Sequence, residues 1–305
     1  MLNLMRFMLF FLLLQVGAAT AATSLLAAEG RVLVFGRAQD DPVRAIRDRQ
    51  EFVDYMAKKM AHVGISSGKI LVVDNLHLLS NAIKEKKVDL FHDSPVPTMV
   101  LARQTGAIPI LRQWKYGEAE YESVILARKG SGIENLPDLE GKVLGFDEPH
   151  STSAHVVPRM LLTEKKMKLV HVKSTGAAKP KAVGYVFGSD GSAVNLLITG
   201  RVDAAATSLR EYEELRPEIR DSLKIVGKTM SVPRQLIAVR KDLDPKLVKA
   251  LREVLLAMDS DPEGQQVLKR QQRSTKIDEI PPSAMQQLRS IERFVFSMPE
   301  KVNSW

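Results

Sequence analysis

The feature that most constrains the fold of this chain is a repeated alternation of short apolar runs with longer amphipathic segments. Residues 31–35 (RVLVF) are the first such run and predict a buried strand. Asp41 and Pro42 then mark a helix start, followed by apolar residues at helical spacing as far as Met60. This alternation is typical of parallel strands joined by crossover helices. We therefore expect an α/β fold.

The same reasoning extends along the chain. Further strands are predicted at residues 69–73, 88–91, 107–111, 122–129, 142–146, 169–172, 203–206, 223–226 and 235–239. Helices are predicted at residues 76–83, 95–102, 152–162 and 190–198, and the tail from Pro245 onward is expected to be helical. These elements form two α/β series with no flexible linker between them, which indicates two lobes joined by strands.

Composition excludes several classes of protein. The chain has 305 residues and no cysteine, so disulfides, zinc–thiolate sites, a cysteine nucleophile and a lipid-modified N-terminal cysteine are excluded. The net charge of +8 is scattered along the sequence and comes with no nucleic-acid-binding motif, so we expect no nucleic-acid partner. The six histidines are dispersed, so we expect no metal and no cofactor.

The first 28 residues resemble a secretory signal. An apolar block from Phe7 to Leu14 is too short for a membrane span, which needs about 20 apolar residues. Small residues follow, and cleavage is expected after Ala21 or after Ala28. An uncleaved anchor is the alternative. In both cases the folded part lies outside the cytoplasm, and a free periplasmic protein is the simplest prediction.

A row of three hydroxyl residues stands where a strand gives way to a helix, in the segment GFDEPHSTSAHVVPRMLL (residues 145–162). Ser151, Thr152 and Ser153 add hydrogen-bond donors to the unpaired N–H groups of a helix start, which together favour an oxyanion. One of them is sufficient as a helix cap, so a purely structural role is the alternative. A serine nucleophile with His150 or His155 is disfavoured, because the flanking glycines of a nucleophile elbow are absent.

Four segments together resemble the phosphate/phosphite/phosphonate-binding proteins of ABC importers, a type II periplasmic binding family. They are VDLFHDSP (residues 88–95), YESVILARKGSGIENLPDLEGKVLGF (121–146), DEPHSTSAHVVP (147–158) and GSDGSAVNLLITGRVDAAA (188–206). The third resembles the family signature most closely, with Ala154 in place of a glycine. The resemblance covers the chain from about Arg31 to about Asp244.

The resemblance implies a two-lobe type II periplasmic binding protein fold, with mixed, mainly parallel sheets and a hinge of crossing strands. Residues 29–120 plus 233–305 are expected to form lobe 1, and residues 121–232 lobe 2. Ser151, Thr152 and Ser153 would hold the oxygens of the ligand, together with Asp93 and Ser94. Changing Thr152 to Val is then expected to weaken binding and leave folding intact.

Three departures from the family pattern concern the identity of the ligand. Asp190 stands where the family has a pocket histidine, and it either faces the ligand or caps the next helix. Leu76 and Asp93 stand near positions where aromatic residues are expected. Arg210 and Gln235 stand where relatives that bind amino-phosphonates have acidic residues, so a cationic ligand tail is disfavoured. Arg210 would meet a second anionic group or be a solvated surface residue.

The resemblance implies a periplasmic solute-binding component of an ABC importer. It would capture a small oxyanion by hinge closure, without chemistry on the ligand, and deliver it to an ABC permease in the inner membrane. A monomer is expected. The alternative is a ligand-binding sensor or adaptor of the same fold that signals to a membrane kinase.

Overall fold

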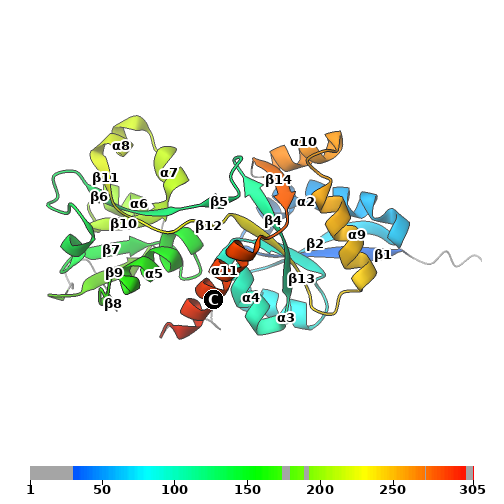
Figure 1. Ribbon diagram of the computed structural model, residues 1–305, viewed down its shortest axis with the longest axis horizontal. Coiled ribbons are helices and arrows are strands. Elements are labelled where there is room, and N and C mark those ends of the chain that lie inside the picture. The colour runs from blue at the N-terminus through cyan, green and yellow to red at the C-terminus, as the bar shows by residue number, and fades with distance from the viewer. Residues whose placement is uncertain (1–29, 174–178, 189–191, 272, 300–304) are drawn as a thin grey trace, which may run out of the picture.

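The computed structural model shows two α/β lobes side by side, joined by extended segments of chain (Figure 1). The structure describes residues 30–173, 179–188, 192–271, 273–299 and 305. The predicted signal segment and Asp190 lie outside these residues. Two lobes of mixed α/β structure confirm the predicted fold class.

The first lobe is built on a six-stranded sheet with the order β14-β4-β13-β3-β1-β2. Its strands are β1 (Arg31–Ala38), β2 (Ile65–Val73), β3 (Leu90–Asp93), β4 (Ile108–Lys115), β13 (Gln235–Val239) and β14 (Ser274–Asp278). Its helices are α2 (Pro42–Lys59), η1 (Ala61–Val63), α3 (Leu76–Lys84), α4 (Pro95–Thr105), α9 (Pro245–Leu256), α10 (Pro262–Arg270) and α11 (Pro282–Ser297). Strands from both ends of the chain therefore share this sheet.

The second lobe is built on a six-stranded sheet with the order β11-β6-β10-β7-β9-β8. Its strands are β6 (Ser123–Arg128), β7 (Val143–Phe146), β8 (Leu169–His171), β9 (Val183–Phe187), β10 (Ala204–Ser208) and β11 (Leu223–Lys228). Its helical segments are η2 (Leu136–Leu139), η3 (Thr152–Val156), α5 (Val157–Glu164), α6 (Ala193–Ile198), α7 (Leu209–Glu213) and α8 (Pro217–Ser222).

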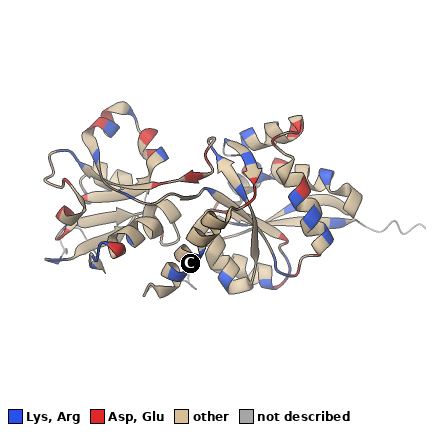
Figure 2. Cartoon of the chain, viewed as in Figure 1, with Lys and Arg blue, Asp and Glu red and all other residues tan. Residues whose placement is uncertain are grey.

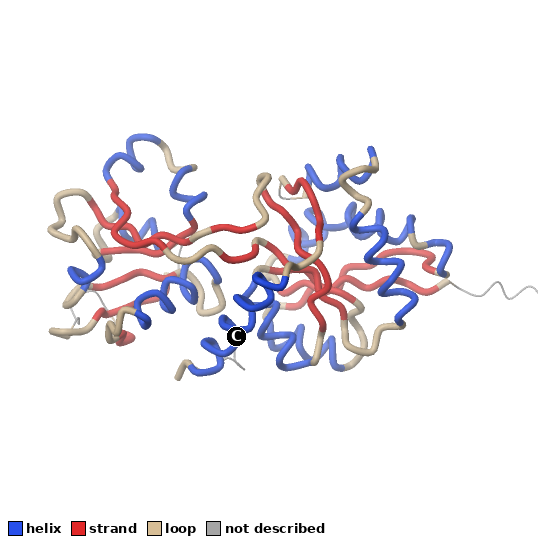
Figure 3. The backbone as a smooth tube through the Cα atoms, in the orientation of Figure 1, coloured by secondary structure: helices blue, strands red, loops and turns tan. Residues whose placement is uncertain are grey.

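Two short strands run between the lobes. β5 (Glu120–Tyr121) and β12 (Val232–Pro233) pair in antiparallel fashion and form a separate two-stranded ribbon. Figure 3 shows this ribbon as the extended connection between the two sheets. The chain thus passes from one sheet to the other at both strands of the ribbon.

Helices cover both faces of each sheet, which explains why the central strands are apolar at successive positions. In β3, Leu90 packs into a cluster with α2 and α9, whereas Phe91 packs into a cluster with α3, α4 and α11. In β6, Val124 and Ile125 likewise enter different clusters. Since successive side chains of a strand point to opposite faces, a strand buried on both sides reads as a continuous apolar run.

The strand directions bring one edge of each sheet to the space between the lobes. In the first lobe, β4 is antiparallel to β13 and β13 is antiparallel to β3, so β4 and β3 run the same way. The carboxyl ends of β1 to β4 and the amino end of β13 therefore lie together along the side of the sheet where these strands end. In the second lobe, the carboxyl ends of β7, β9 and β10 meet in the same manner. Ligands of such sheets bind beyond the carboxyl ends of the strands.

Some predicted elements differ from the structure. The tail from Pro245 is not wholly helical, because residues 274–278 pair with β4 as edge strand β14. Strand β9 was not predicted, since Gly184 interrupts its apolar run, yet it pairs with both β7 and β8. In the two large sheets, five pairings are parallel and five antiparallel, so antiparallel pairing is more extensive than the helix–strand alternation implied.

Charged residues of both signs are interspersed along both lobes in the cartoon of Figure 2, which matches the scattered charge of the sequence. In the part of the chain that the structure describes, no helix has the length and hydropathy needed to cross a membrane.

Candidate functional site

A cavity of about 580 Å³ lies between the facing edges of the two sheets. Seven of the eight predicted ligand-binding residues line it, namely Asp93, Ser94, Ser151, Thr152, Ser153, Arg210 and Gln235. The eighth, Asp190, lies outside the described residues. The structure therefore brings together residues that are up to about 140 positions apart in the sequence.

The junction between β7 and α5 presents the hydroxyl row to this cavity. The Ser151 hydroxyl caps the helix by accepting a hydrogen bond from the Ala154 N–H at 3.1 Å. The helix does not begin as the predicted α-helix: residues 152–156 form a π-helical turn, in which the Val156 N–H donates to the Ser151 carbonyl at 3.0 Å. Such turns are rare and occur frequently at functional sites. The α-helical part begins at Val157.

A second helix begins at the same cavity from the first lobe. Ser94 is the N-cap residue of α4, and its side chain makes no cap bond within the described part of that helix. Asp93 holds the turn in place, because one carboxylate oxygen accepts from the Ser94 N–H at 2.7 Å and the other pairs with Arg37 at 2.8 Å. Pro95 follows at the first helical position, where its missing N–H costs nothing.

The middle hydroxyl of the row joins the two lobes. Thr152 is 2% exposed, and its Oγ1 donates to Ser94 Oγ at 3.0 Å and accepts from the Val96 N–H at 3.0 Å. Val156 and Val157 pack in the same hydrophobic cluster as Val96. The expectation that Thr152→Val leaves folding intact is therefore corrected, since the hydroxyl already satisfies a buried backbone donor.

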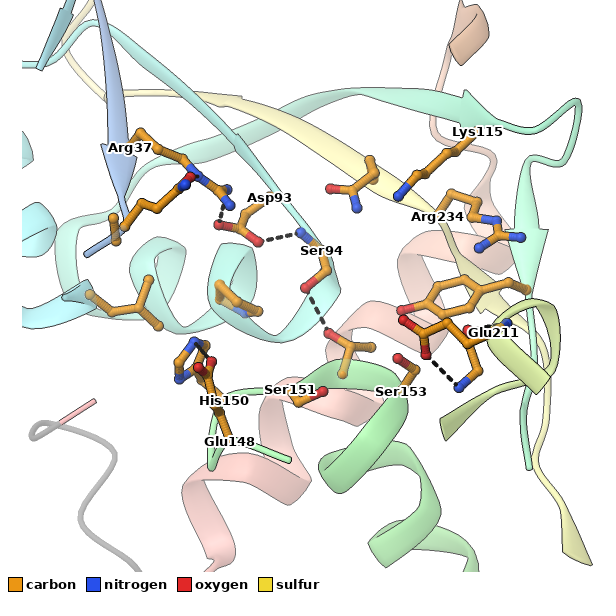
Figure 4. Close-up of a pocket in the computed structure, with 18 of the residues that line it drawn as sticks. Arg37, Asp93, Ser94, Lys115, Glu148, His150, Ser151, Ser153, Glu211 and Arg234 are labelled. Carbon is orange, nitrogen blue, oxygen red and sulfur yellow. Dashed lines mark hydrogen bonds and ion pairs between the residues drawn. The ribbon is translucent and has the colours of Figure 1, made fainter. Parts of the chain in front are cut away.

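The two helix starts make the cavity suitable for an anion. A helix N-terminus presents unpaired N–H groups and about half a positive charge. Figure 4 shows Ser94, Ser151 and Ser153 around one side of the cavity, with the N-terminal turns of both helices beneath and behind them. The first turn of α4 contributes its helix dipole and the Ser94 hydroxyl, because Pro95 and Pro97 lack an N–H and the N–H groups of Val96 and Thr98 already donate within the protein. The second lobe contributes the start of the helix that follows Ser151 and its serine hydroxyls.

Aromatic rings also line the cavity, although they are not at the positions where the resemblance placed them. Tyr116 and Tyr121 are among the lining residues, and so is Trp305, which is 8% exposed. Burial raises the pKa of Tyr121, and the nearby side chains of Ser153 and Thr152 partly oppose this shift. Leu76 and Asp93 do line the cavity, so the predicted positions are in the site but the rings come from elsewhere.

Three cations of the site, Arg37, Lys115 and Arg234, were missed by reasoning from the sequence. Lys115 is the last residue of β4, and Arg234 directly precedes β13. The Arg234 guanidinium lies 4.7 Å from the centre of the Tyr121 ring and pairs with Glu118. Burial, and then the charge of Arg234, lower the pKa of Lys115. Their position in the sequence could have revealed them, because each lies near an end of a predicted strand, and ligands bind beyond the strand ends of such sheets.

A family model described as ABC transporter, phosphonate, periplasmic substrate-binding protein matches residues 37–284. The chain belongs to this family. Its members are periplasmic substrate-binding proteins of ABC transporters. The predicted family is thereby confirmed.

Individual relatives agree with this assignment. The phosphonates-binding periplasmic protein of Escherichia coli K12 is 26% identical over 163 residues, which are 50% of this chain and 45% of that relative. The chain thus matches less than half the length of this curated relative. The XAC2383 protein of Xanthomonas citri, solved with chloride, superposes with a TM-score of 0.80 at 27% identity, over 87% of this chain and 97% of that one. A second structure of that protein, bound to ATP, gives a TM-score of 0.79 at 26% identity, over the same shares of the two chains.

A more distant family structure supports the fold alone. PhnD1 of Prochlorococcus marinus, in complex with methylphosphonate, has a TM-score of 0.65 at 19% identity and covers 88% of this chain and 99% of that one.

The two histidines beside the hydroxyl row have contacts of their own. His150 Nε2 pairs with Glu148 at 2.9 Å. His155 is fully buried, and its Nδ1 lies 2.7 Å from the Pro149 carbonyl oxygen. Both contacts are made within the segment that carries Ser151.

Arg210 and Gln235 lie on opposite lobes. Arg210 belongs to α7, where it pairs with Glu214 at 3.0 Å and lies 4.7 Å from the centre of the Tyr116 ring. Gln235 begins β13 at the edge of the first sheet. Both line the cavity, so Arg210 is not merely a solvated surface residue.

Proposed function

We propose that this chain is the periplasmic solute-binding component of an ABC importer, and that it captures an oxyanion such as a phosphonate, phosphite or phosphate between its lobes. The observation that carries the proposal is the convergence of two helix N-termini, from different lobes, on one cavity lined by hydroxyl groups. This arrangement favours an anion without requiring a cation in direct contact.

Known relatives support an anionic ligand. The protein of Xanthomonas citri was solved with chloride and with ATP, both of which are anions. The relative from Escherichia coli is described as binding phosphonates. The hydroxyl groups of Ser94, Ser151 and Ser153, with the backbone N–H groups of the helical turn that follows Ser151, are the groups of this chain that would hold the oxygens.

The mechanism proposed is hinge closure. Residues 29–120 with 233–305 would move as one lobe and residues 121–232 as the other. The paired segments at Tyr121 and Val232 form the only two-stranded ribbon among the described residues, and they connect the two sheets. A pair of crossing strands absorbs small backbone rotations, which is what a hinge requires.

Export, location and partners follow from the same proposal. The first 28 residues would act as a cleaved signal peptide, and the mature chain would work as a monomer in the periplasm with a permease of the inner membrane. The chain would perform no chemistry on its ligand. A sensor or adaptor that signals to a membrane kinase is not favoured, because the matching family is described by its role in transport.

Ligand titration of the purified chain tests the proposal. Methylphosphonate, phosphite, phosphate and sulfate would be compared by calorimetry and by thermal unfolding. A ligand at a hundredfold excess over its Kd stabilises the folded state by about 2.7 kcal/mol, which raises the melting temperature. Tight binding of at least one phosphorus oxyanion, lost in Ser151→Asp, is the expected result. No stabilisation by any of the four anions would contradict the proposed function.

A further inference from the structure

We propose that the cavity holds two anionic groups, and that the ligand is a phosphonate or phosphate with a second negatively charged group. This inference rests on the proposed function and specifies the chemical class of the ligand. The first subsite is the hydroxyl row with the two helix starts. The second is the cationic cluster around Tyr116, formed by Lys115, Arg210 and Arg234.

The size of the cavity is the first argument. A methylphosphonate ion fills about 150 Å³ if each of its non-hydrogen atoms takes about the volume of a water molecule, ~30 Å³. The cavity of about 580 Å³ is several times larger. It lies within the range of roughly 300–1,000 Å³ that is usual for pockets that hold larger organic molecules.

The two lobes are already in contact at two places in this structure. Thr152 bonds to Ser94 and to the Val96 N–H. In addition, Arg273 of the first lobe lies 3.7 Å from the Glu214 carboxylate of the second lobe. The space is therefore not the gap of a wide-open hinge, and a ligand larger than phosphite is needed to fill it.

The cluster around Tyr116 is the second argument. Lys115 Nζ lies 5.1 Å from the centre of its ring, and the guanidinium carbons of Arg210 and Arg234 lie at 4.7 Å and 5.6 Å. Three cations that line one cavity and surround one ring repel one another, and bound negative charge relieves this repulsion. Arg210 pairs with Glu214 and Arg234 with Glu118. A third carboxylate of the cavity, Glu211, accepts from the Thr207 hydroxyl and the Ser208 N–H, so Lys115 is the cation of this cluster without an ion pair among the described residues.

Two nitrogen groups of this cluster have capacity left for a ligand. Among the described residues, no carboxylate lies within ion-pair distance of Lys115 Nζ. Arg234 is 6% exposed, and its Nε is buried without a hydrogen-bond partner. Burial, and then the charge of Arg234, lower the pKa of Lys115, and the carboxylates of Glu211 and Glu214 only partly oppose this shift. Figure 4 shows Lys115 and Arg234 on the same side of the cavity, with the Lys115 amine directed inward.

The two subsites adjoin each other without coinciding. Tyr121 links them, because it lines the cavity beside Thr152 and Ser153 while its ring centre lies 4.7 Å from the Arg234 guanidinium. The opposite end of the first sheet is unsuitable for an anion, since the exposed carboxylates of Asp40 and Asp74 follow β1 and β2 there. A second anionic group is thus directed toward the β4 side of the cavity.

A matched pair of ligands and a matched pair of variants test this inference. Phosphonoacetate differs from methylphosphonate by one carboxylate, so the ratio of their Kd values measures the second subsite. Lys115→Met removes the unpaired cation but keeps the aliphatic stem. Lys276→Met is the control, because Lys276 also lies over an aromatic ring, 5.6 Å from the centre of Trp114, but does not line the cavity.

Calorimetry should show that phosphonoacetate binds at least tenfold more tightly than methylphosphonate to the unmodified chain and to Lys276→Met. In Lys115→Met that advantage should fall to about threefold or less, with the Kd of methylphosphonate nearly unchanged. Equal weakening of both ligands in Lys115→Met would overturn the inference, because it would place Lys115 in the first subsite. Tighter binding of methylphosphonate than of phosphonoacetate would also overturn it, while leaving the proposed function intact. Binding of neither ligand, nor of phosphate, would contradict the proposed function itself.

Discussion

The two strand–helix junctions that meet at the cavity are built from similar sequence but divide their hydroxyl groups differently. β3 ends in Asp93, followed directly by Ser94 and the start of α4. β7 is followed by Asp147 and by a longer loop that ends in three hydroxyl residues. The short junction has one serine at the helix start. In the long junction three hydroxyl residues divide the hydrogen bonds among themselves.

This difference shows what the additional residues of the second junction contribute. Ser151 caps its own helix, Thr152 accepts from the Val96 N–H of the other helix, and Ser153 stays directed to the cavity. α4 is therefore capped from across the cavity instead of by its own serine. One sequence signal, a hydroxyl before a helix, thus supports a cap, a link between lobes and a candidate ligand contact.

The largest expected effect comes from placing a charge in the long junction. Ser151→Asp keeps a good N-cap, so the free energy of unfolding should change by no more than about 0.5 kcal/mol. A carboxylate at this point should repel a bound anion by about 3 kcal/mol or more, which is at least a hundredfold in Kd. Titration with methylphosphonate measures this, and Asn135→Asp, which adds a charge at a cap far from the cavity, is the control. Unchanged affinity in Ser151→Asp would show that the junction is only structural.

Removing the third hydroxyl should have the next largest effect. Ser153→Ala deletes a donor to a charged group, which costs about 1.5–3 kcal/mol, or roughly ten- to 150-fold in affinity. The stability of the unliganded chain should stay the same, because no cap depends on this side chain. If Kd remains at the level of the unmodified chain, the oxygens are held by backbone N–H groups alone.

Thr152→Val separates the link between lobes from ligand binding. The Val96 N–H would lose its acceptor in a buried place, and the loss should lower the free energy of unfolding by about 1–3 kcal/mol. Urea denaturation of the unliganded chain measures this, with Thr152→Ser as the variant that restores the hydroxyl. A Val variant as stable as the Ser variant would show that α4 needs no cap from the other lobe.

The smallest expected effect is a change in the pH dependence of stability, and it concerns the aspartates at the carboxyl ends of β3 and β7. Asp93 pairs with Arg37, whereas Asp147 accepts from the Ala193 N–H at 2.6 Å and has no ion pair among the described residues. Burial raises the pKa of Asp147 to about 6, above its value of about 3.9 in an unfolded chain. Between these values the folded state binds more protons than the unfolded state, so stability should fall as pH rises from about 4 to 6.

Thermal unfolding across this pH range provides the test. Asp147→Asn should remove the part of the decrease in melting temperature between pH 4 and 6 that this carboxyl group causes. It should also raise the melting temperature at pH 7. Asp93→Asn should leave that decrease in place, although it removes the partner of Arg37. An unchanged decrease in Asp147→Asn would show that another group carries the pH dependence.

Reasoning from the sequence predicted most of the strands that are buried on both faces, because burial makes them apolar at successive positions. It failed for β14, a strand at the edge of the first sheet. Residues 235–239 were predicted as a strand because both of their faces are buried, which produces an uninterrupted apolar run. Residues 274–278 (STKID) lack such a run, since β14 is an edge strand with exposed Thr275 and Lys276, and the pattern was lost among the helices of the tail. Local periodicity reports burial, and an edge strand exposes too much of its surface to show it.

The sequence by itself determined the alternation of strands and helices, the family resemblance and the hydroxyl row, because these depend on neighbouring residues and on local hydrogen bonds. Only the tertiary structure decided which side chains meet at the cavity. Lys115 and Arg234 become neighbours because β4 and β13 pair across more than a hundred residues of chain. The role of Thr152 was likewise decided by a backbone donor on the other lobe. Contacts of this kind arise from packing and strand pairing between distant segments, and no local pattern encodes them.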